Sequence, residues 1–364
     1  MKVILSCGGT GGHIYPAIAI ADKIKERNPD AEILFIGTKK GMENRLVPAA
    51  GYEIKGIDAR GFDRENLLNN FKTVKTFFEG NQEVYHIIKD YSPDLAIGTG
   101  GYVTGSVISV AHRLKVKTCI HEQNALPGVA NKFLSGFADK VFISFEGTES
   151  AFKHPERVVL SGNPIRSGFT KLDRGTCRKE LGIADGQTMI LVFGGSLGAG
   201  VLNRETLGLI DGIRSADIKL YFVTGKRYYD EIKAQVDAME GDKSFLELIP
   251  YADNMPQLMS ASDLVVSRAG AIAVSEIAAC GKPSVLVPSP NVTNNHQYYN
   301  AKAIADAGAA LLVEEKDLPE GGSVLAREVL ALAEDPRRLT AMAECAKRIG
   351  RTNAADIICD SIGI

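Results

Sequence analysis

Two glycine-rich segments, each placed directly after an apolar run, could bind a phosphate group. Residues 8–12 (GGTGG) follow the apolar run 2–7, and residues 194–200 (GGSLGAG) follow the apolar run 189–193. Glycines between a strand and a helix let the backbone approach an anion closely and direct N–H groups of the helix N-terminus at it. Ser196 adds a hydroxyl donor to the second segment. A tight turn without a ligand is the alternative for either segment alone.

His13 is the first candidate for proton transfer. It follows the glycines of residues 8–12 and precedes Pro16, which suits the first turn of a helix over residues 17–27. An imidazole at the carboxyl edge of an open α/β sheet faces the crevice where ligands of such sheets bind. It could act as a general base or bind a ligand, and the alternative is an ordinary surface or core histidine.

Four consecutive polar residues, 121–124 (HEQN), follow the predicted strand 118–120. Hydrogen-bonding side chains at the end of a buried strand could recognise hydroxyl or phosphate groups, and the alternative is a polar loop. His121 and Glu122 are adjacent, which is not the spacing of metal ligands.

A further predicted helix start lies in residues 267–276 (SRAGAIAVSE), where small side chains leave backbone N–H groups accessible. Glu276 falls within the first two turns and could accept hydrogen bonds from two vicinal hydroxyls, such as those of a ribose. A favourable interaction with the positive helix N-terminus is the alternative. Residues 294–297 (NNHQ) offer amide groups that could bind sugar hydroxyls, although alone they are only a polar loop.

Residues 67–78 mix bulky apolar and basic side chains. Phe71, Val74 and Phe78 recur at helical spacing, with Lys72 and Lys75 beside them. Such a segment could lie on an anionic membrane surface. An ordinary core-facing helix with solvated lysines explains the same pattern equally well.

The elements that position these residues indicate an α/β protein with doubly wound parallel sheets. Short, wholly apolar strands alternate with amphipathic helices, which is typical of parallel sheets covered on both faces. The pattern occurs twice, because residues 3–12 resemble residues 190–200 and residues 94–101 resemble residues 263–270. We therefore expect two Rossmann-like units with a boundary near residues 161–164.

Composition excludes several classes of protein. The 364 residues favour two domains, and 42 basic against 44 acidic side chains argue against a general nucleic-acid binder. The six scattered cysteines predict neither a disulfide framework nor structural zinc. No apolar run is long enough to span a bilayer, and no signal peptide is recognisable, so we expect a soluble cytoplasmic protein. The glycine-rich segments match neither the P-loop pattern nor G-x-G-x-x-G, which disfavours a P-loop nucleotidase and a nicotinamide dehydrogenase.

Taken together, the motifs resemble the MurG family, the bacterial N-acetylglucosaminyltransferases of glycosyltransferase family 28 that convert lipid I to lipid II in peptidoglycan synthesis. The resemblance runs from residue 3 to about residue 300 and rests on seven motifs in order: residues 8–17, 100–105, 121–128, 162–166, 194–199, 268–276 and 295–297. It implies a GT-B fold, in which two Rossmann-like domains face each other across a cleft. The expected domains are residues 1–163, facing acceptor and membrane, and residues 164–342, binding UDP-N-acetylglucosamine. A C-terminal helix over about residues 343–364 is expected to pack back onto the first domain.

The resemblance also implies roles for individual residues. In the second domain, Ser196 would contact the diphosphate, Arg166 the nucleotide, and the backbone of Ala252 the uracil. Gln297 would bind the sugar, and the helix start would hold the diphosphate and ribose through Ala271, Ile272, Ala273, Val274, Ser275 and Glu276. In the first domain, residues that would close over the donor are Thr10, Gly11, Gly12 and Asn124. His13 resembles the candidate acid–base residue, and the presumed acceptor side would be lined by Tyr102, Glu122 and Asn131.

The implied reaction is an inverting transfer of N-acetylglucosamine from UDP-N-acetylglucosamine to the C4 hydroxyl of the N-acetylmuramyl-pentapeptide of lipid I. We expect no obligatory metal and no cofactor. The expected partners are these two substrates, an anionic membrane surface at the cytoplasmic face of the cell membrane, and other cell-wall synthesis proteins. Alternatives are a UDP-N-acetylglucosamine 2-epimerase and a non-catalytic sugar-nucleotide-binding or membrane-tethering subunit.

Overall fold

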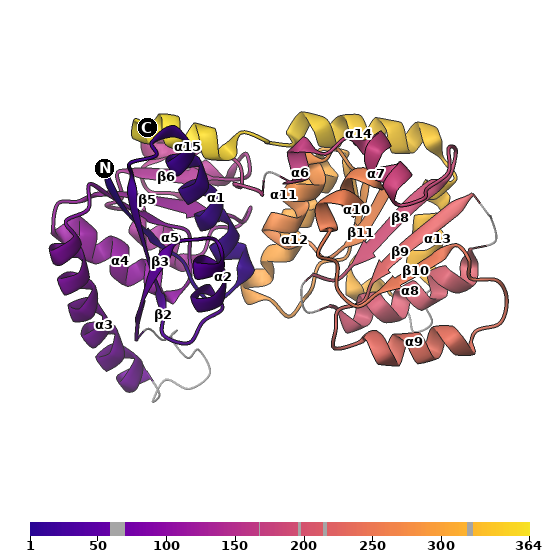
Figure 1. The fold of residues 1–364 in the computed structure, drawn as a ribbon, viewed down its shortest axis with the longest axis horizontal. Helices are drawn as coiled ribbons and strands as arrows, with labels where there is room; N and C mark the ends of the chain where they lie inside the picture. The colour runs from indigo at the N-terminus through magenta and orange to yellow at the C-terminus, as the bar shows by residue number, and fades with distance from the viewer. Residues whose placement is uncertain (59–69, 167, 196–197, 214–216, 319–322) are drawn as a thin grey trace. The chain divides into compact units, whose positions relative to one another are not determined.

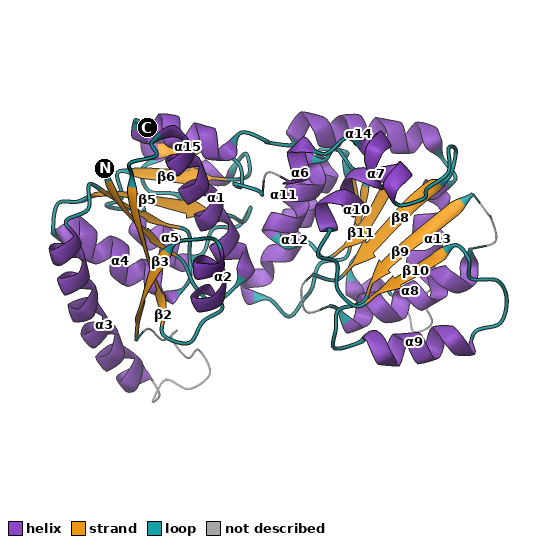
Figure 2. Ribbon diagram, in the orientation of Figure 1, coloured by secondary structure: helices purple, strands orange, loops and turns teal. Residues whose placement is uncertain are grey.

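A computed structural model describes residues 1–364 apart from 59–69, 167, 196–197, 214–216 and 319–322. For residues 70–79 and 323 it describes the backbone but not the side chains. The chain forms two compact units. The first comprises Met1–Ile165 and Asn353–Ile364, and the second comprises Arg166–Thr352. In each unit, helices flank a central sheet (Figure 2).

The first unit contains a seven-stranded sheet in the order β3-β2-β1-β4-β5-β6-β7 (Figure 1), and its strand pairings are parallel. Its strands are β1 Lys2–Ser6, β2 Glu32–Thr38, β3 Glu53–Ile57, β4 Leu95–Gly98, β5 Lys117–Glu122, β6 Lys140–Ile143 and β7 Val158–Leu160. Its helices are α1 Gly11–Arg27, α2 Glu43–Ala49, α3 Asn70–Tyr91, α4 Tyr102–Arg113, α5 Val129–Leu134 and α15 Ala354–Ile362, with 3₁₀ turns η2 Thr148–Ala151 and η3 Pro155–Arg157.

Alternation along the strands builds one core on each face of this sheet. Val3 and Leu5 of β1 pack with α1 and α15, whereas Ile4 packs with α3 and α4 on the opposite face. Successive side chains of a strand point to opposite faces, so a wholly apolar strand needs helices on both. The amphipathic helices between the strands meet that need.

The second unit contains a six-stranded sheet in the order β10-β9-β8-β11-β12-β13, also with parallel pairings. Its strands are β8 Thr188–Phe193, β9 Ile218–Val223, β10 Leu246–Ile249, β11 Leu264–Ser267, β12 Ser284–Leu286 and β13 Ala310–Leu312. Its helices are α6 Gly168–Lys171, α7 Arg174–Glu180, α8 Gly200–Gly212, α9 Tyr229–Ala238, α10 Met255–Ala261, α11 Ala271–Ala279, α12 His296–Asp306, α13 Ser323–Ala333 and α14 Pro336–Ile349, with 3₁₀ turns η4 Thr293–Asn295 and η5 Glu315–Asp317.

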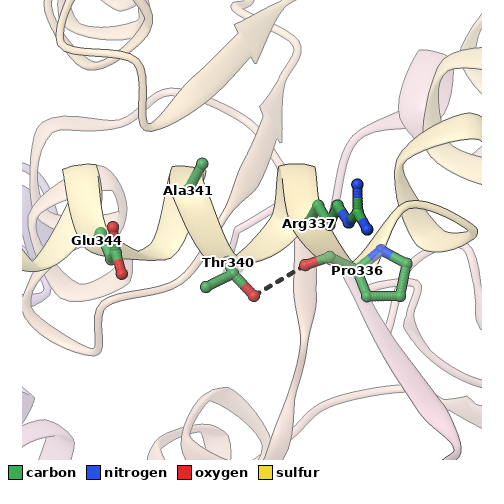
Figure 3. A pocket seen from close by; sticks show the side chains of 5 residues that line it. All are labelled: Pro336, Arg337, Thr340, Ala341 and Glu344. Atoms are coloured by element: carbon green, nitrogen blue, oxygen red, sulfur yellow. Dashed lines mark hydrogen bonds between the residues drawn. The ribbon is translucent and has the colours of Figure 1, made fainter.

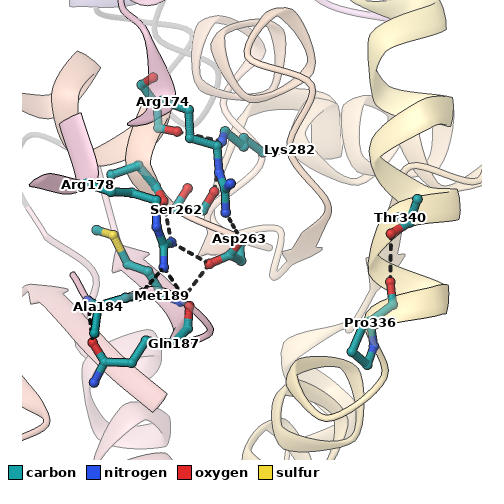
Figure 4. A network of polar contacts seen from close by, with 12 residues as sticks. Arg174, Arg178, Ala184, Gln187, Met189, Ser262, Asp263, Lys282, Pro336 and Thr340 are labelled. Atoms are coloured by element: carbon teal, nitrogen blue, oxygen red, sulfur yellow. Dashed lines mark hydrogen bonds and ion pairs between the residues drawn. The ribbon is translucent and has the colours of Figure 1, made fainter. Parts of the chain in front are cut away.

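A polar network ties together the amino ends of β8 and β11 in the second unit (Figure 4). Asp263 accepts hydrogen bonds from Arg178 Nη1 at 2.9 Å and from the backbone N–H of Met189 at 2.8 Å. The buried Lys282 donates to the carbonyl oxygens of Ser260 and Ser262 at 2.7 and 2.8 Å. Asp263, Arg178 and Lys282 thus bind groups of the same unit. We therefore interpret the network as a stabilising cluster at the edge opposite the strand carboxyl ends.

The C-terminal region differs from the single helix expected over about residues 343–364. The chain forms α14 in the second unit and, after a break at Gly350, α15 in the first. A Cβ at Gly350 would lie 2.4 Å from the carbonyl oxygen of Ala278, so the close approach of α11 requires glycine there. In the first unit, Arg27 of α1 donates to Asp356 of α15 at 2.6 Å, and Ile358 is buried in the shared core.

Candidate functional site

In the first unit, the candidate residues gather at the carboxyl ends of β1, β4 and β5. His13 lies in the first turn of α1, and its Nδ1 is 3.0 Å from the carbonyl oxygen of Gly8. A carbonyl oxygen can only accept, so Nδ1 carries the proton of this hydrogen bond. In the neutral ring, Nε2 therefore has a lone pair that can take a proton. The Thr99 hydroxyl donates to the His13 carbonyl oxygen at 2.8 Å and fixes the backbone at this point.

Two glycines after β4 allow this arrangement by close approach. A Cβ at Gly100 would lie 2.5 Å from Cδ2 of His13, and a Cβ at Gly101 would lie 2.5 Å from the carbonyl oxygen of Gly8. Both glycines also have positive φ, +119° and +88°. Space and backbone conformation together therefore require glycine at these positions.

His121 is a structural residue in this unit. Its ring is fully buried and lies between the Gly162 carbonyl oxygen, 3.0 Å from Nε2, and the Gln123 amide nitrogen, 2.9 Å from Nδ1. These partners place the ring proton on Nε2. Burial lowers the pKa of His121 to about 4, so the ring is neutral near pH 7.

Glu122 organises the loop that follows β5. Its Oε1 accepts from the backbone N–H and the side-chain Nδ2 of Asn124, at 3.0 and 3.1 Å. Its Oε2 accepts from the Gly128 N–H at 3.0 Å and from Asn131 Nδ2 at 2.8 Å. The carboxylate thus connects the end of β5 to the start of α5, bringing together Glu122, Asn124 and Asn131. Contact of Asn124 with the donor, and of Glu122 and Asn131 with the acceptor, stays a prediction.

The polar run 121–124 is therefore only partly available to a ligand. His121, Glu122 and Gln123 are buried and bind the protein's own backbone and side chains. Polar groups buried beside β5 need such internal partners. Recognition of a ligand by this run stays a prediction. Asn124 is half-buried.

Exposed candidates surround this buried shell. Tyr102 begins α4 and its side chain is 66% exposed. Thr10 is exposed at the N-cap of α1, followed by the half-buried Gly11 and Gly12. The first turn of α1 contains no acidic side chain, which leaves its positive N-terminus available to an anion.

In the second unit, Glu276 and Arg166 are brought together. Glu276 lies in α11, is almost fully buried, and has Oε1 at 3.3 Å from Arg166 Nη2. Arg166 also stacks on the Phe169 ring, with 4.9 Å between its guanidinium carbon and the ring centroid. Burial raises the pKa of Glu276 to about 7, against the opposing charge of Arg166. A buried carboxylate beside one arginine could accept hydrogen bonds from a diol.

The other candidates of the second unit lie at or near the same carboxyl edge. Gln297 lies in the first turn of α12, and its Oε1 accepts from the Ser289 N–H at 2.9 Å. Ala252 is half-buried between β10 and α10. Ser196 lies outside the described residues. The remaining candidates form the first turns of α11: Ala271, Ile272, Ala273, Val274 and Ser275.

Two surface depressions lie apart from these candidates. One, of about 450 Å³, is lined by five residues of α14 (Figure 3), where Thr340 donates to the Pro336 carbonyl oxygen at 2.8 Å. The other, of about 400 Å³, is lined by residues between Ile143 and Leu160. A depression lined by a single helix does not enclose a ligand, so the candidate residues described above remain the better guide to the site.

Sequence reasoning missed Glu43, a fully buried carboxylate at the start of α2 that contacts the glycine-rich loop after β1. A glutamate at a helix start is common, and its local sequence carries no signal of a distant partner.

Comparison with known proteins decides the family. Residues 3–143 match the glycosyltransferase family 28 N-terminal domain, and residues 189–358 match the glycosyltransferase family 28 C-terminal domain. The chain belongs to glycosyltransferase family 28. It is therefore a glycosyltransferase with the GT-B fold, as the motifs predict.

Individual relatives agree with this family assignment. A protein of Acetivibrio thermocellus, named UDP-N-acetylglucosamine–N-acetylmuramyl-(pentapeptide) pyrophosphoryl-undecaprenol N-acetylglucosamine transferase, is 48% identical over 100% of this chain and 97% of its own length. The crystal structure of Acinetobacter baumannii MurG matches with a TM-score of 0.80 and 28% identity, over 100% of this chain and 99% of that one. A UDP-GlcNAc 2-epimerase of Neisseria meningitidis shares the fold alone, with a TM-score of 0.69 and 16% identity over 100% and 99% of the two chains.

The raised pKa of Glu276 predicts a pH-dependent stability. Its folded value of about 7 exceeds the ordinary 4.5, so the native carboxyl keeps its proton where the unfolded one has lost it. The retained proton adds to the free energy of unfolding. This contribution is complete below about pH 4.5 and is lost as the pH rises through 7. Glu276→Gln stays neutral throughout. We expect the free energy of unfolding of the variant, relative to wild type, to increase by about 1–3 kcal/mol between pH 5 and 8.

Urea denaturation at each pH measures this difference. Glu334→Gln, at an exposed position of the same unit, is the control and should show no trend. A constant difference for Glu276→Gln would contradict the proposed effect of burial.

Proposed function

We propose that this glycosyltransferase transfers N-acetylglucosamine from UDP-N-acetylglucosamine to the C4 hydroxyl of the N-acetylmuramyl-pentapeptide of lipid I, giving lipid II and UDP. The observation that carries the proposal is the full-length likeness to a relative whose name states this donor and acceptor. The candidate residues at the strand ends of the two units include groups that could bind a diphosphate, bind a diol and accept a proton. This enzyme acts in peptidoglycan synthesis.

The donor is held by the second unit in this proposal. Glu276 accepts hydrogen bonds from the ribose hydroxyls, Gln297 binds the sugar, and the backbone of Ala252 contacts the uracil. Positive N-termini of α8 and α11, with Ser196 and Arg166, offset the charge of the diphosphate. The buried Glu276 and the half-buried Gln297 and Ala252 support the assignment, since a site must be shielded from water for such interactions to be strong.

The chemical step is a single displacement at the anomeric carbon. The C4 hydroxyl oxygen of the acceptor attacks this carbon, the bond to the UDP oxygen breaks, and the configuration inverts from α to β. UDP leaves with the electron pair, and the hydroxyl proton goes to Nε2 of His13. The hydrogen bond from His13 Nδ1 to Gly8 supports this role, because it leaves Nε2 as the acceptor. Thr10, Gly11, Gly12 and Asn124 close over the donor, and Tyr102, Glu122 and Asn131 lie on the acceptor side.

UDP release from UDP-N-acetylglucosamine, in EDTA, with and without a lipid I analogue, tests the function. We expect release that requires the analogue and yields a disaccharide product, with no requirement for a divalent metal. Release without the analogue, together with N-acetylmannosamine, would instead identify a 2-epimerase. Donor binding without any turnover would indicate a non-catalytic subunit.

Replacement of His13 tests the base. His13→Ala should lower kcat about 10²–10⁴-fold, because no side chain then accepts the hydroxyl proton, and should leave KM for UDP-N-acetylglucosamine nearly unchanged. His154→Ala, at a histidine that pairs with Glu156 on the surface of the same unit, is the matched control. A loss confined to donor affinity would reject the role of base.

We also propose that the enzyme is a peripheral protein at the cytoplasmic face of the cell membrane. No helix among the described residues is long and apolar enough to span a bilayer. The side chains of the segment 67–78 lie outside the described residues, but α5 presents Val129 and Phe133, 65% and 70% exposed, beside the exposed Lys132. Apolar side chains next to a basic one are suited to an anionic lipid surface.

Phe133→Ser should weaken binding to anionic vesicles at least about threefold, since an exposed aromatic ring would no longer enter the lipid interface. Cosedimentation with vesicles measures the binding. Leu172→Ser, at an exposed apolar residue of the second unit, is the control. Equal vesicle binding by Phe133→Ser and wild type would count against α5 as the membrane surface.

A further inference from the structure

Glu43 is a buried carboxylate that the reaction described above does not use. It begins α2 and is completely inaccessible to solvent. Its Oε1 accepts from the backbone N–H of Thr38 at 2.8 Å and from the Thr38 hydroxyl at 2.7 Å. Its Oε2 accepts from the backbone N–H of Gly9 at 3.3 Å.

The same peptide group that Glu43 binds also binds His13. The Gly9 N–H and the Gly8 carbonyl belong to one peptide, and the Gly8 carbonyl oxygen accepts from His13 Nδ1 at 3.0 Å. A carboxylate, a planar peptide and an imidazole are thus joined in series by two hydrogen bonds. Hydrogen bonds in such a chain polarise one another, so the negative charge on Glu43 strengthens the carbonyl as an acceptor.

Packing leaves little freedom for the carboxylate. A Cβ at Gly41 would lie 2.1 Å from Glu43 Oε2, and a Cβ at Gly37 would lie 2.5 Å from Glu43 Cγ. Glycine at both positions therefore makes the space that the side chain fills. The turn between β2 and α2 is built around the carboxylate, which points at the loop after β1.

The hydrogen bonds keep Glu43 ionised. Burial alone would raise its pKa, but donors from the Thr38 hydroxyl and from backbone N–H groups, including that of Gly9, outweigh burial and the pKa is lowered. Burial and the charge of Glu43 raise the pKa of Cys7, which stays a neutral thiol. Lys39, on the same turn, is paired with Asp58 and Glu83 instead.

The other groups around His13 supply little negative charge. His13 lies in the first turn of α1, whose N-terminus is the positive end of the helix dipole. His121, which interacts electrostatically with His13, is neutral near pH 7, and the Glu122 charge beside it is shared among four N–H donors. Glu43, joined to His13 through the peptide between Gly8 and Gly9, is then the carboxylate best placed to stabilise an imidazolium formed there.

We propose that Glu43 is a positioning residue that acts on His13 through the peptide between Gly8 and Gly9, holding Nδ1 as the donor and stabilising the imidazolium formed when Nε2 takes the acceptor proton. Glu43 remains a carboxylate throughout, and no proton crosses the peptide. This inference rests on the proposed function, in which His13 is the base. In enzymes with a nucleophile and a base, a third group often orients the base. Glu43 would orient His13 in the same way.

The first test is on the wild-type protein and needs no variant. Nitrogen-15 NMR of the imidazole groups reports which ring nitrogen carries the proton, and His13→Ala identifies the His13 signals among those of the six histidines. We expect a neutral His13 protonated at Nδ1. A neutral ring protonated at Nε2 would overturn the proposal.

The second test removes the charge. Glu43→Gln keeps the size of the side chain, but its amide nitrogen cannot accept from Gly9. The NMR titration midpoint of His13 should move to lower pH by at least about 0.5 units, because the imidazolium loses a stabilising negative charge. Thr38→Val removes one hydrogen bond to Glu43 and keeps the charge, so its midpoint should match that of wild type even if its melting temperature falls. Equal midpoints in wild type and a folded Glu43→Gln would overturn the proposal.

Kinetics then separate this inference from the proposed function. In Glu43→Gln, the acidic limb of the pH profile of kcat/KM should move to lower pH with the NMR midpoint. Its plateau should fall about three- to tenfold, with KM for UDP-N-acetylglucosamine unchanged, because a less basic imidazole takes the proton less readily. A moved NMR midpoint with unchanged kinetics would overturn the catalytic part of the inference. Wild-type protein that forms no disaccharide would instead overturn the proposed function.

Discussion

Parallel pairing is the constraint on which the rest of the structure depends. Within the described residues, the strand pairings of both sheets are parallel. A chain that forms such a sheet must return from the carboxyl edge to the amino edge through a helix after each strand. The loops that leave the strands therefore collect at one edge, where His13, Thr99 and Gln123 meet although they are far apart in sequence. The opposite edge of the second unit is left to the stabilising cluster around Asp263.

Crowding at the carboxyl edge buries some polar groups and leaves others exposed. The buried groups hold the loops in place, and the exposed groups are available to a ligand. His121, Glu122 and Glu43 are inaccessible or nearly so, and hydrogen bonds to neighbouring backbone groups hold each of them. A buried polar group that loses its partner costs about 1–3 kcal/mol, so these bonds fix the loops firmly. Exposed or half-buried groups such as Tyr102 and His13 are then presented on a rigid frame.

Local sequence patterns predict the frame better than the contacts within it. Wholly apolar strands followed by glycines are enough to anticipate two α/β units and the glycine-rich loop between β1 and α1, because these features depend on neighbours in sequence. The break at Gly350 is not predictable in this way, since it depends on the Ala278 carbonyl oxygen of another helix. The internal hydrogen bonds of the two carboxylates are equally hard to predict from local sequence. Glu122 binds Asn131, nine residues away, and Glu43 binds Gly9, 34 residues away.

The core of the first unit is completed by a segment distant in sequence, residues 353–364. The polypeptide leaves this unit after Ile165 and returns at Asn353, where α15 adds Ile358 and Ile362 to the core beside α1. During synthesis on a ribosome, the strip of α1 that these residues cover is in contact with water until the second unit has been translated. The first unit of the nascent chain therefore has an incomplete core, accessible to chaperones and proteases, until residues 353–364 have been synthesised.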